Sequence, residues 1–171
     1  DNLQYDLHPV VRGYAFSQLG DSERPQTFAR IYDFFDKQER GNNRMRLFSS
    51  YKDLQNLIAM YNALIGTGKF DLAAELFKDR ISYSLVVGGL GLYHKAYELL
   101  LPLFPNGLHD LPAVSDPNLK GLILNLMSSV LSYLGRYEEE IAISAMNLKV
   151  NFAISTERVI SGLSNYCISL E

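Results

Sequence analysis

Hydrophobic positions recur at helical spacing through most of the chain, and the pattern is most regular from residue 51 onward. One apolar face predicts a first helix, and it consists of Leu54, Leu57, Ile58, Tyr61, Leu64 and Ile65. A turn at residues 66–69 follows, and a second helix begins at Phe70. The small Ala73, between Phe70 and Phe77, suits two helices packed closely together. This segment therefore predicts a helical hairpin.

The same pattern returns toward the other end of the chain. A second apolar face is made of Leu122, Leu126, Val130, Leu131 and Leu134. A turn at residues 135–137 and a partner helix over 138–148 follow it. Gly68 and Gly135 are 67 residues apart, close to two 34-residue units of the tetratricopeptide repeat (TPR). The spacing thus indicates repeated helical hairpins.

The segments between and beyond these two hairpins are less regular. A middle copy over residues 91–97 starts only 23 residues after Gly68 and is out of register. Residues 102–117 carry four of the six prolines and predict a long irregular connection. Adjacent Gly88 and Gly89 each lower helix stability by about 1 kcal/mol relative to alanine, which predicts a break. Residues 158–170 predict the first helix of a further repeat.

The first 50 residues follow a different pattern. Residues 3–7 alternate apolar and polar positions and predict a short strand, and residues 10–19 predict a helix that ends at Gly20. A further helix begins after residues 21–23, and its apolar stripe is Phe28, Ile31, Tyr32 and Phe35. The polar residues 40–44 predict a linker. We expect no strand after residue 8, so the predicted fold class is all-α, a TPR-like helical-hairpin solenoid.

Composition limits what the chain can do. Its 171 residues suffice for one ordinary domain, and 47% hydrophobic with 20% charged residues indicates a globular chain. The formal net charge of −3 gives no general attraction to nucleic acid or to anionic membranes. The longest apolar stretches, 84–93 and 99–104, are too short to span a bilayer. We therefore expect no nucleic acid and no membrane among its partners.

Cysteine content and the chain ends bear on location and completeness. The single Cys167 permits no internal disulfide, which fits a cytoplasmic protein, and its apolar-rich surroundings predict a buried thiol. The chain starts at Asp1 with no signal-like segment, and it stops at Glu171 just after an amphipathic stretch. Both ends look cut, so we expect a piece of a longer protein. Its open terminal repeat predicts self-association through exposed apolar surface.

Two turns and several short segments resemble known families. Residues 68–73 and 134–138 resemble TPR turns, although Glu140 stands where the TPR pattern has a small residue. Residues 7–15 resemble the end of the winged-helix domain of NB-ARC-type STAND signalling ATPases, which carry a Met-His-Asp motif there. His8 matches that histidine, whereas leucine and proline replace its neighbours. Similarities to the TPR sensor regions of bacterial NB-ARC proteins lie at residues 76–81, 103–107 and 111–112.

This resemblance implies a domain organisation and a function. Residues 1–20 would be a winged-helix remnant, residues 21–50 a connecting helix and linker, and residues 51–171 the TPR-like repeats. The repeats would be the sensor arm of a signalling ATPase in bacterial defence, recognising a protein or peptide trigger and restraining the ATPase domain. In such proteins the histidine matched by His8 contacts the ADP phosphate. This chain would hold no cofactor itself, whereas the longer protein would bind ADP or ATP.

Several motifs invite a catalytic or ligand-binding interpretation but match it poorly. The turn at residues 66–69 has Ala63 and Phe70 where a phosphate loop needs glycine and serine or threonine. The glycines at 88–91 lack the third glycine of a dinucleotide fingerprint. The three histidines are scattered and do not predict a metal site. Residues 138–140, three glutamates, complement a helix start. We expect no catalytic site in this chain.

The candidate binding surface is the concave face of the repeats, formed mainly by the first helix of each hairpin. Spacing places four polar residues on it: Asn62, Asn125, Ser129 and Tyr133. Their amides and hydroxyls could clamp a peptide backbone, or they could simply be solvated. Two further functions stay open, a peptide-binding TPR regulator of transcription and an enzyme with an unrecognised helical active site.

Overall fold

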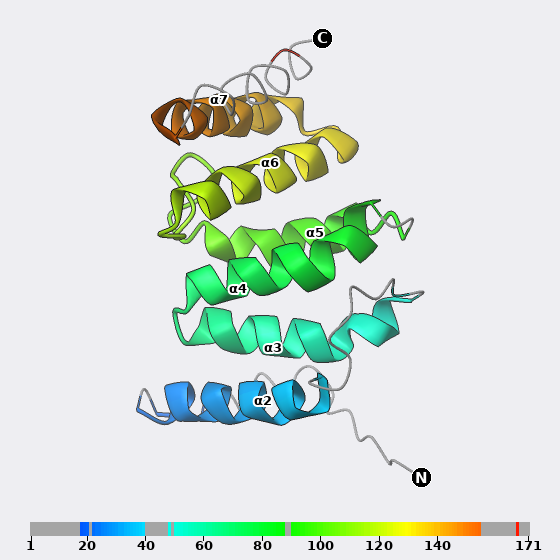
Figure 1. Cartoon of the computed structure of the whole chain (residues 1–171), viewed down its shortest axis with the longest axis vertical. Coiled ribbons are helices and arrows are strands. Elements are labelled where there is room, and N and C mark those ends of the chain that lie inside the picture. Colours follow the sequence, from blue (N-terminus) through cyan, green and yellow to red (C-terminus); the bar gives the residue numbers. More distant parts are fainter. Residues whose placement is uncertain are drawn as a thin grey trace.

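The computed structural model describes residues 18–20, 22–39, 48, 50–87, 90–154 and 167, and within these ranges the chain is all-α with no strand. The helices stack one upon another along the long axis of the molecule, from α2 at one end to α7 at the other (Figure 1). The fold class predicted from the hydrophobic pattern is therefore confirmed as all-α. The predicted strand at 3–7 and the linker at 40–44 lie outside the described residues, and so do the winged-helix remnant except residues 18–20 and the helix at 158–170 except Cys167.

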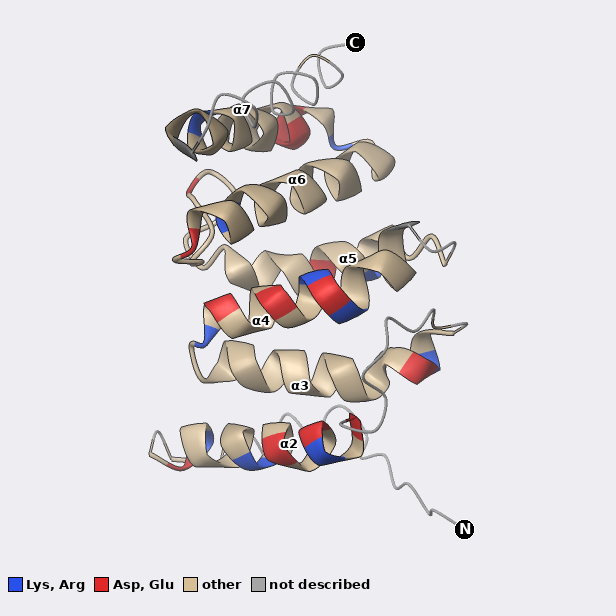
Figure 2. Cartoon of the chain, in the orientation of Figure 1, with Lys and Arg blue, Asp and Glu red and all other residues tan. Residues whose placement is uncertain are grey.

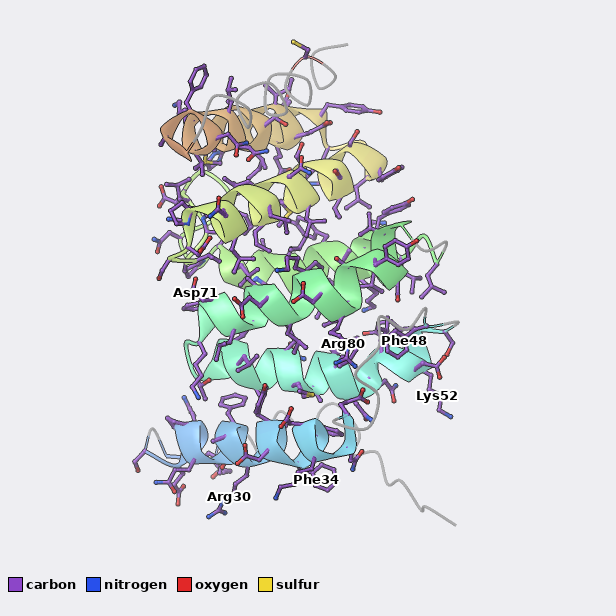
Figure 3. The ribbon with its side chains drawn as sticks, in the orientation of Figure 1. Arg30, Phe34, Phe48, Lys52, Asp71 and Arg80 are labelled. Atoms are coloured by element: carbon purple, nitrogen blue, oxygen red, sulfur yellow. The ribbon has the colours of Figure 1, made fainter. Side chains whose placement is uncertain are left out.

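Helix α2 (Glu23–Glu39) forms one end of the stack. Its predicted stripe is half-buried and faces α3, whereas Arg30 and Phe34 point away from the rest of the molecule (Figure 3). None of its residues is fully buried. One of its rings fits closely, because a Cβ at Gly66 would lie 2.3 Å from ring atoms of Phe28. The missing side chain at Gly66 thus lets α2 approach α3.

The first hairpin follows the predicted boundaries. A short 3-10 turn, η1 (Tyr51–Leu54), leads into α3 (Gln55–Gly66). After the turn, α4 (Phe70–Leu76) continues through two π-helical segments, η2 (Phe77–Ile81) and η3 (Tyr83–Val87). The helical path ends at Val87 and the next helix begins at Tyr93, on either side of the predicted break. Gly88 and Gly89 themselves lie outside the described residues.

The second half contains a short helix and a long hairpin. Helix α5 (Tyr93–Leu100) ends in the 3-10 turn η4 (Leu101–Leu103), and an irregular connection runs to Asp116 as the prolines predict. Helices α6 (Pro117–Tyr133) and α7 (Tyr137–Ile154) pack against each other along their length. Asp116 caps α6 by accepting a hydrogen bond from the Leu119 N–H at 2.8 Å. The acidic first turn of α7 lies at the positive end of its dipole.

The two hairpin turns are built alike. Gly68 and Gly135 both have φ of +70°, a left-handed conformation that glycine adopts without steric cost. In each turn the residue after the glycine donates its N–H to a carbonyl five residues earlier: Lys69 to Leu64 and Arg136 to Leu131, both at 2.9 Å. These are the bonds of a Schellman helix end. The repeat at a spacing of 67 residues is thus present in the backbone as well as in the sequence.

The core fills the middle of the stack. Its largest fully buried side chains come from η1, α3, η2, η3, α5, η4 and α6: Leu54, Leu57, Tyr61, Phe77, Ile81, Leu85, Leu100, Leu103, Ile123, Leu124, Met127 and Leu131. The Tyr61 hydroxyl donates to the carbonyl of Leu99, and burial raises the pKa of Tyr61. This bond links α3 to α5, which are separated in the sequence by α4, η2 and η3.

The contact between α6 and α7 is unusually polar. On α7 the residues Glu140, Ser144, Asn147 and Asn151 recur at heptad spacing, and all four are buried. The Ser144 and Ser128 hydroxyls lie 2.7 Å apart across the contact. Glu140 occupies the place of Ala73 in the first hairpin and is 4% exposed. The departure from the TPR pattern at this position does not prevent the two helices from pairing.

One sequence prediction is wrong, because Cys167 is exposed rather than buried. An apolar-rich stretch buries only the face that meets a neighbour, and a cysteine within it can lie on the other face. Within the described part of the chain, no helix is both long and apolar enough to cross a membrane.

Candidate functional site

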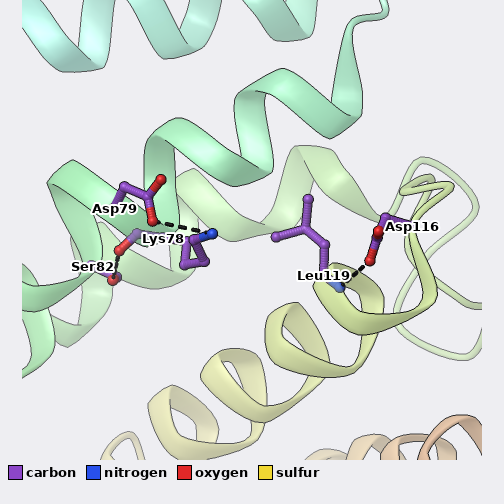
Figure 4. Close-up of polar contacts among 5 residues, drawn as sticks. All are labelled: Lys78, Asp79, Ser82, Asp116 and Leu119. Carbon is purple, nitrogen blue, oxygen red and sulfur yellow. Dashed lines mark hydrogen bonds and ion pairs between the residues drawn. The ribbon is translucent and has the colours of Figure 1, made fainter. Parts of the chain in front are cut away.

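A groove opens where α4, the start of α6 and the second half of α7 come together. Its volume is about 510 Å³. It is lined by Glu75, Lys78, Asp116, Asn118, Leu119, Gly121, Leu122, Asn125, Asn147 and Asn151. Figure 4 shows the part of it between Lys78 and the capped start of α6. Four of the ten lining residues are asparagines, so amide groups dominate its polar surface.

The α7 wall carries the two most buried polar side chains of the groove. Asn147 is 3% exposed and Asn151 is 8% exposed. The Asn151 Nδ2 donates to the Asn147 Oδ1 at 3.1 Å. This is the one hydrogen bond of the two side chains among the described residues, so one amide NH₂ and one amide carbonyl oxygen keep their hydrogen-bonding capacity.

Gly121 makes room for this pair. It lies in the interior of α6, where glycine costs about 1 kcal/mol of helix stability relative to alanine. A Cβ at this position would lie 3.1 Å from the Asn151 Oδ1 and 3.6 Å from the Asn147 Oδ1. The bare backbone of Gly121 therefore forms the floor on which the two amides rest.

The α6 wall adds amides and an apolar ledge. Asn118, Leu122 and Asn125 follow one another at helical spacing along one face. Leu122 is 37% exposed, which leaves an apolar surface open inside a polar groove. A ligand could thus make hydrogen bonds and an apolar contact at once.

The α4 wall supplies charge. Glu75 of α4 and Lys78 of η2, which continues α4, line the groove, and the Lys78 ammonium lies 3.1 Å from the Asp79 carboxylate (Figure 4). Acidic residues follow one another along α4, whereas α3 carries no charged residue (Figure 2). With Asp116 at the α6 end, two carboxylates and one ammonium face the groove.

Asp71 fixes the distance between the α4 wall and the α6 wall. Its Oδ1 accepts hydrogen bonds from the backbone N–H groups of Ser115, at 2.7 Å, and Asp116, at 3.3 Å. Burial by itself would raise the pKa of Asp71, but these bonds outweigh it and hold the pKa below its usual value. The charged carboxylate thus ties the start of α4 to the residues that precede α6 (Figure 3 marks its place).

The structure brings only part of the predicted binding residues together. Asn125 lines the groove, and the Ser129 hydroxyl, one turn further along α6, donates to the Asn125 carbonyl oxygen at 3.0 Å. Tyr133 is 63% exposed and stacks on Tyr93 with ring centroids 4.2 Å apart. Asn62 is exposed on α3, outside the groove. Asn118, Asn147 and Asn151 were not predicted.

Two features of the sequence could have indicated the asparagines on α7. Asn147 and Asn151 are one helical turn apart on α7, and Gly121 interrupts a helix that has no other glycine. Each feature marks a close approach of helices. The four predicted binding residues all lie on the first helix of a hairpin, whereas Asn147 and Asn151 lie on the second helix, α7.

The other motifs have ordinary structural positions. The phosphate-loop-like residues 66–69 form the hairpin turn, with Gly68 in the left-handed region. His94 and His109 are exposed, and His8 lies outside the described residues. Over the ranges that the structure describes, no three histidine, cysteine, aspartate or glutamate side chains are grouped to hold a metal.

A second cluster lies where α5 meets the α6–α7 turn. The Arg136 guanidinium makes two bonds of 2.7 Å to the Glu139 carboxylate and lies 4.5 Å from the centre of the Tyr97 ring. The hydrogen bond to Glu139 is the main reason that the pKa of Arg136 is raised. Each group already has a partner, so the cluster stabilises the turn.

Comparison of the chain with protein-family models, with curated proteins and with solved structures finds no match in any of the three.

Proposed function

We propose that this chain is a TPR-like interaction scaffold that binds an extended peptide segment of a protein partner in the groove of α4, α6 and α7. The observation that carries the proposal is the Asn147–Asn151 pair. Two buried amides that line the groove are hydrogen-bonded to each other, and the pair retains one NH₂ group and one carbonyl oxygen for a ligand.

A peptide backbone suits this arrangement. Each peptide unit carries one N–H donor and one C=O acceptor. When two amide side chains share one hydrogen bond, one NH₂ and one carbonyl oxygen remain, whichever way round the amides are assigned. The groove therefore matches a main chain, and Leu122 offers contact to an apolar side chain.

The repeat character supports the TPR-like part of the proposal. Each of the two hairpins has a glycine turn, and the two turns are 67 residues apart. The glycines have the same φ, and the N–H groups after them donate to carbonyls at equivalent positions. Stacked helical hairpins with such a period commonly present a continuous binding surface to a partner.

We further propose that the scaffold is the sensor arm of an NB-ARC-type signalling ATPase in the cytoplasm. This step rests on the sequence resemblance of residues 7–15 and of the segments after residue 76. The scaffold itself would have no catalytic residue and no cofactor, and His8 would act only beside the ADP of the longer protein. The test is ATP hydrolysis by the longer protein with and without residues 51–171. If the longer protein neither binds nor hydrolyses ATP, the proposal is contradicted, and a peptide-binding regulator of transcription is favoured.

The groove is tested by peptide binding. An array of acetylated, amidated octapeptides is probed with the chain and with the Asn147→Ala and Asn151→Ala variants. Each variant should weaken binding by roughly tenfold, because it leaves a backbone group of the peptide without its partner. Helicity measured by circular dichroism confirms that the variants fold.

Asn62→Ala is the matched control. It removes the same side chain from an exposed position on α3 and should leave the affinity unchanged. Equal weakening by all three variants would contradict the assignment of the groove, and so would a failure of every peptide to bind.

A further inference from the structure

We infer that the groove selects an internal segment of its partner that carries a basic side chain, and that it disfavours the free carboxylate of a C-terminus. The inference rests on the proposed function, since it names the chemistry of the peptide that the amide groups hold. It is carried by the charges around the Asn147–Asn151 pair and by the apolar surface of Leu122.

The carboxylates of the groove are placed to receive a cation. Glu75 is exposed on α4, and Asp116 is exposed at the start of α6. Asp116 uses its Oδ1 to cap the Leu119 N–H, which leaves the second oxygen toward solvent and ligand. Asp71 lies beside them and is kept charged by the N–H groups of Ser115 and Asp116. Acidic groups therefore border the groove from two elements.

Among the described residues that line the groove, carboxylates outnumber cations, and Lys120, which acts on the Asp71 carboxylate, is not part of the lining. Lys78 is the only cation among the residues that line the groove, and its ammonium lies 3.1 Å from Asp79 (Figure 4). A carboxylate terminus that bound this lysine would share it with Asp79, while Glu75 and Asp116 repel the ligand. The groove thus disfavours a free C-terminus.

The apolar lining fits the stem of a basic side chain. Leu119 and Leu122 lie on the α6 wall, three and six residues after Asp116, and all three line the groove. A lysine or arginine buries its methylene stem on apolar surface while its charged end stays near water and carboxylates. A basic residue can therefore contact Leu122 and reach an acidic group from one position of the ligand.

The test compares three pools of acetylated, amidated octapeptides that differ at one central position, which carries lysine, norleucine or glutamate. Affinities are measured for the full chain at low and at physiological salt. The lysine pool should bind more tightly than the norleucine pool, and the glutamate pool most weakly. The difference should shrink as salt rises, because the charges are exposed. Lysine peptides with a free C-terminal carboxylate should bind less tightly than the amidated ones.

Variants assign the preference to the groove. Glu75→Gln should lower the affinity for the lysine pool about threefold, and Glu75→Gln with Asp116→Asn about tenfold, since each exposed charge pair contributes modestly. Asparagine also caps a helix, so the second substitution preserves the start of α6. Binding of the norleucine pool should stay unchanged. Glu138→Gln, an exposed glutamate of α7 outside the groove, is the matched control.

The outcomes separate the two proposals. Equal binding of the lysine and glutamate pools, or a preference for the free carboxylate, overturns this inference while the amide groove stands. Loss of the lysine preference in the double variant, with the norleucine pool still bound, supports it. Absence of binding by all three pools overturns the proposed function and this inference together.

Discussion

At the scale of single residues, buried side chains with a defined partner determine the groove. Asn147 and Asn151 hold each other in place over Gly121, and Asp71 holds the opposite side through backbone N–H groups. A hydrogen bond between buried polar groups holds both of them in one arrangement. The geometry of the groove therefore depends on a few polar contacts rather than on its apolar lining.

Asp71 makes the free energy of unfolding depend on pH. Its pKa is lower in the folded chain than in the unfolded chain, so its contribution to the free energy of unfolding is complete above the unfolded value near 4. That contribution is lost as the pH falls through the lower, folded value. Asp71→Asn should reduce stability at pH 7 by about 1 kcal/mol. The figure is modest because solvent reaches the Asp71 carboxylate and its N–H donors.

Urea unfolding between pH 3 and pH 7 measures this effect. The difference in the free energy of unfolding between the parent chain and Asp71→Asn should become smaller as the pH falls below 4. Asp110→Asn, in the exposed connection before α6, is the matched control and should change little at any pH. A difference that stays constant with pH would show that the charge of Asp71 does not act through these bonds.

At the scale of elements, the two hairpins depend on their turns. Gly68 and Gly135 have φ of +70°, and nothing lies within 4 Å of a Cβ at either position. Any effect of substitution therefore comes from the backbone conformation, since there is space for a side chain. This makes the pair a clean test of the Schellman geometry.

Gly68→Ala and Gly135→Ala should each destabilise the chain by about 1 kcal/mol, because an L-residue with a Cβ is strained in the left-handed region. Chemical denaturation followed by circular dichroism measures the change. Gly68→Asn is the control, since asparagine tolerates this region better and should cost less. Equal losses for alanine and asparagine would argue against the backbone explanation.

At the scale of the whole molecule, stability is distributed unevenly along the stack. The fully buried side chains lie between η1 and α7, whereas α2 contributes none. Helix α2 is held by its half-buried stripe, by the Phe28 ring against Gly66 and by the ion pair of Glu39 with Arg80 at 3.1 Å. In a stacked fold each element depends mainly on its neighbours, so α2 should open separately from the rest.

Hydrogen exchange tests this gradient. Amides of α2 should exchange faster than those of α3, and Phe28→Ala should accelerate α2 further while α6 and α7 keep their protection. The reason is that the substitution removes a contact of α2 with Gly66 of α3. Phe34→Ala on the outer face of α2, where the ring is 58% exposed, is the matched control. Equal acceleration in α2 and α7 would indicate one cooperative unit.

Self-association is also a property of the whole molecule, and it stays a prediction. Sedimentation at several concentrations would decide it.

Local chemistry decided which segments became helices and where they ended. The apolar stripe of Phe28 and Tyr32, the glycine turns at Gly68 and Gly135, and the proline-rich connection all predicted elements that the structure contains. Helical periodicity and turn conformation depend on residues within a few positions of one another, so the sequence expresses them directly.

The tertiary structure alone decided which polar residues meet. Glu75, Asn125 and Asn151 line one groove although they come from α4, α6 and α7, whereas Asn62, predicted beside Asn125, lies elsewhere. Their convergence depends on how α4 is placed against α6 and α7, and on the close approach that Gly121 permits. Such distances arise from packing between segments that are remote in the chain, and no local spacing encodes them.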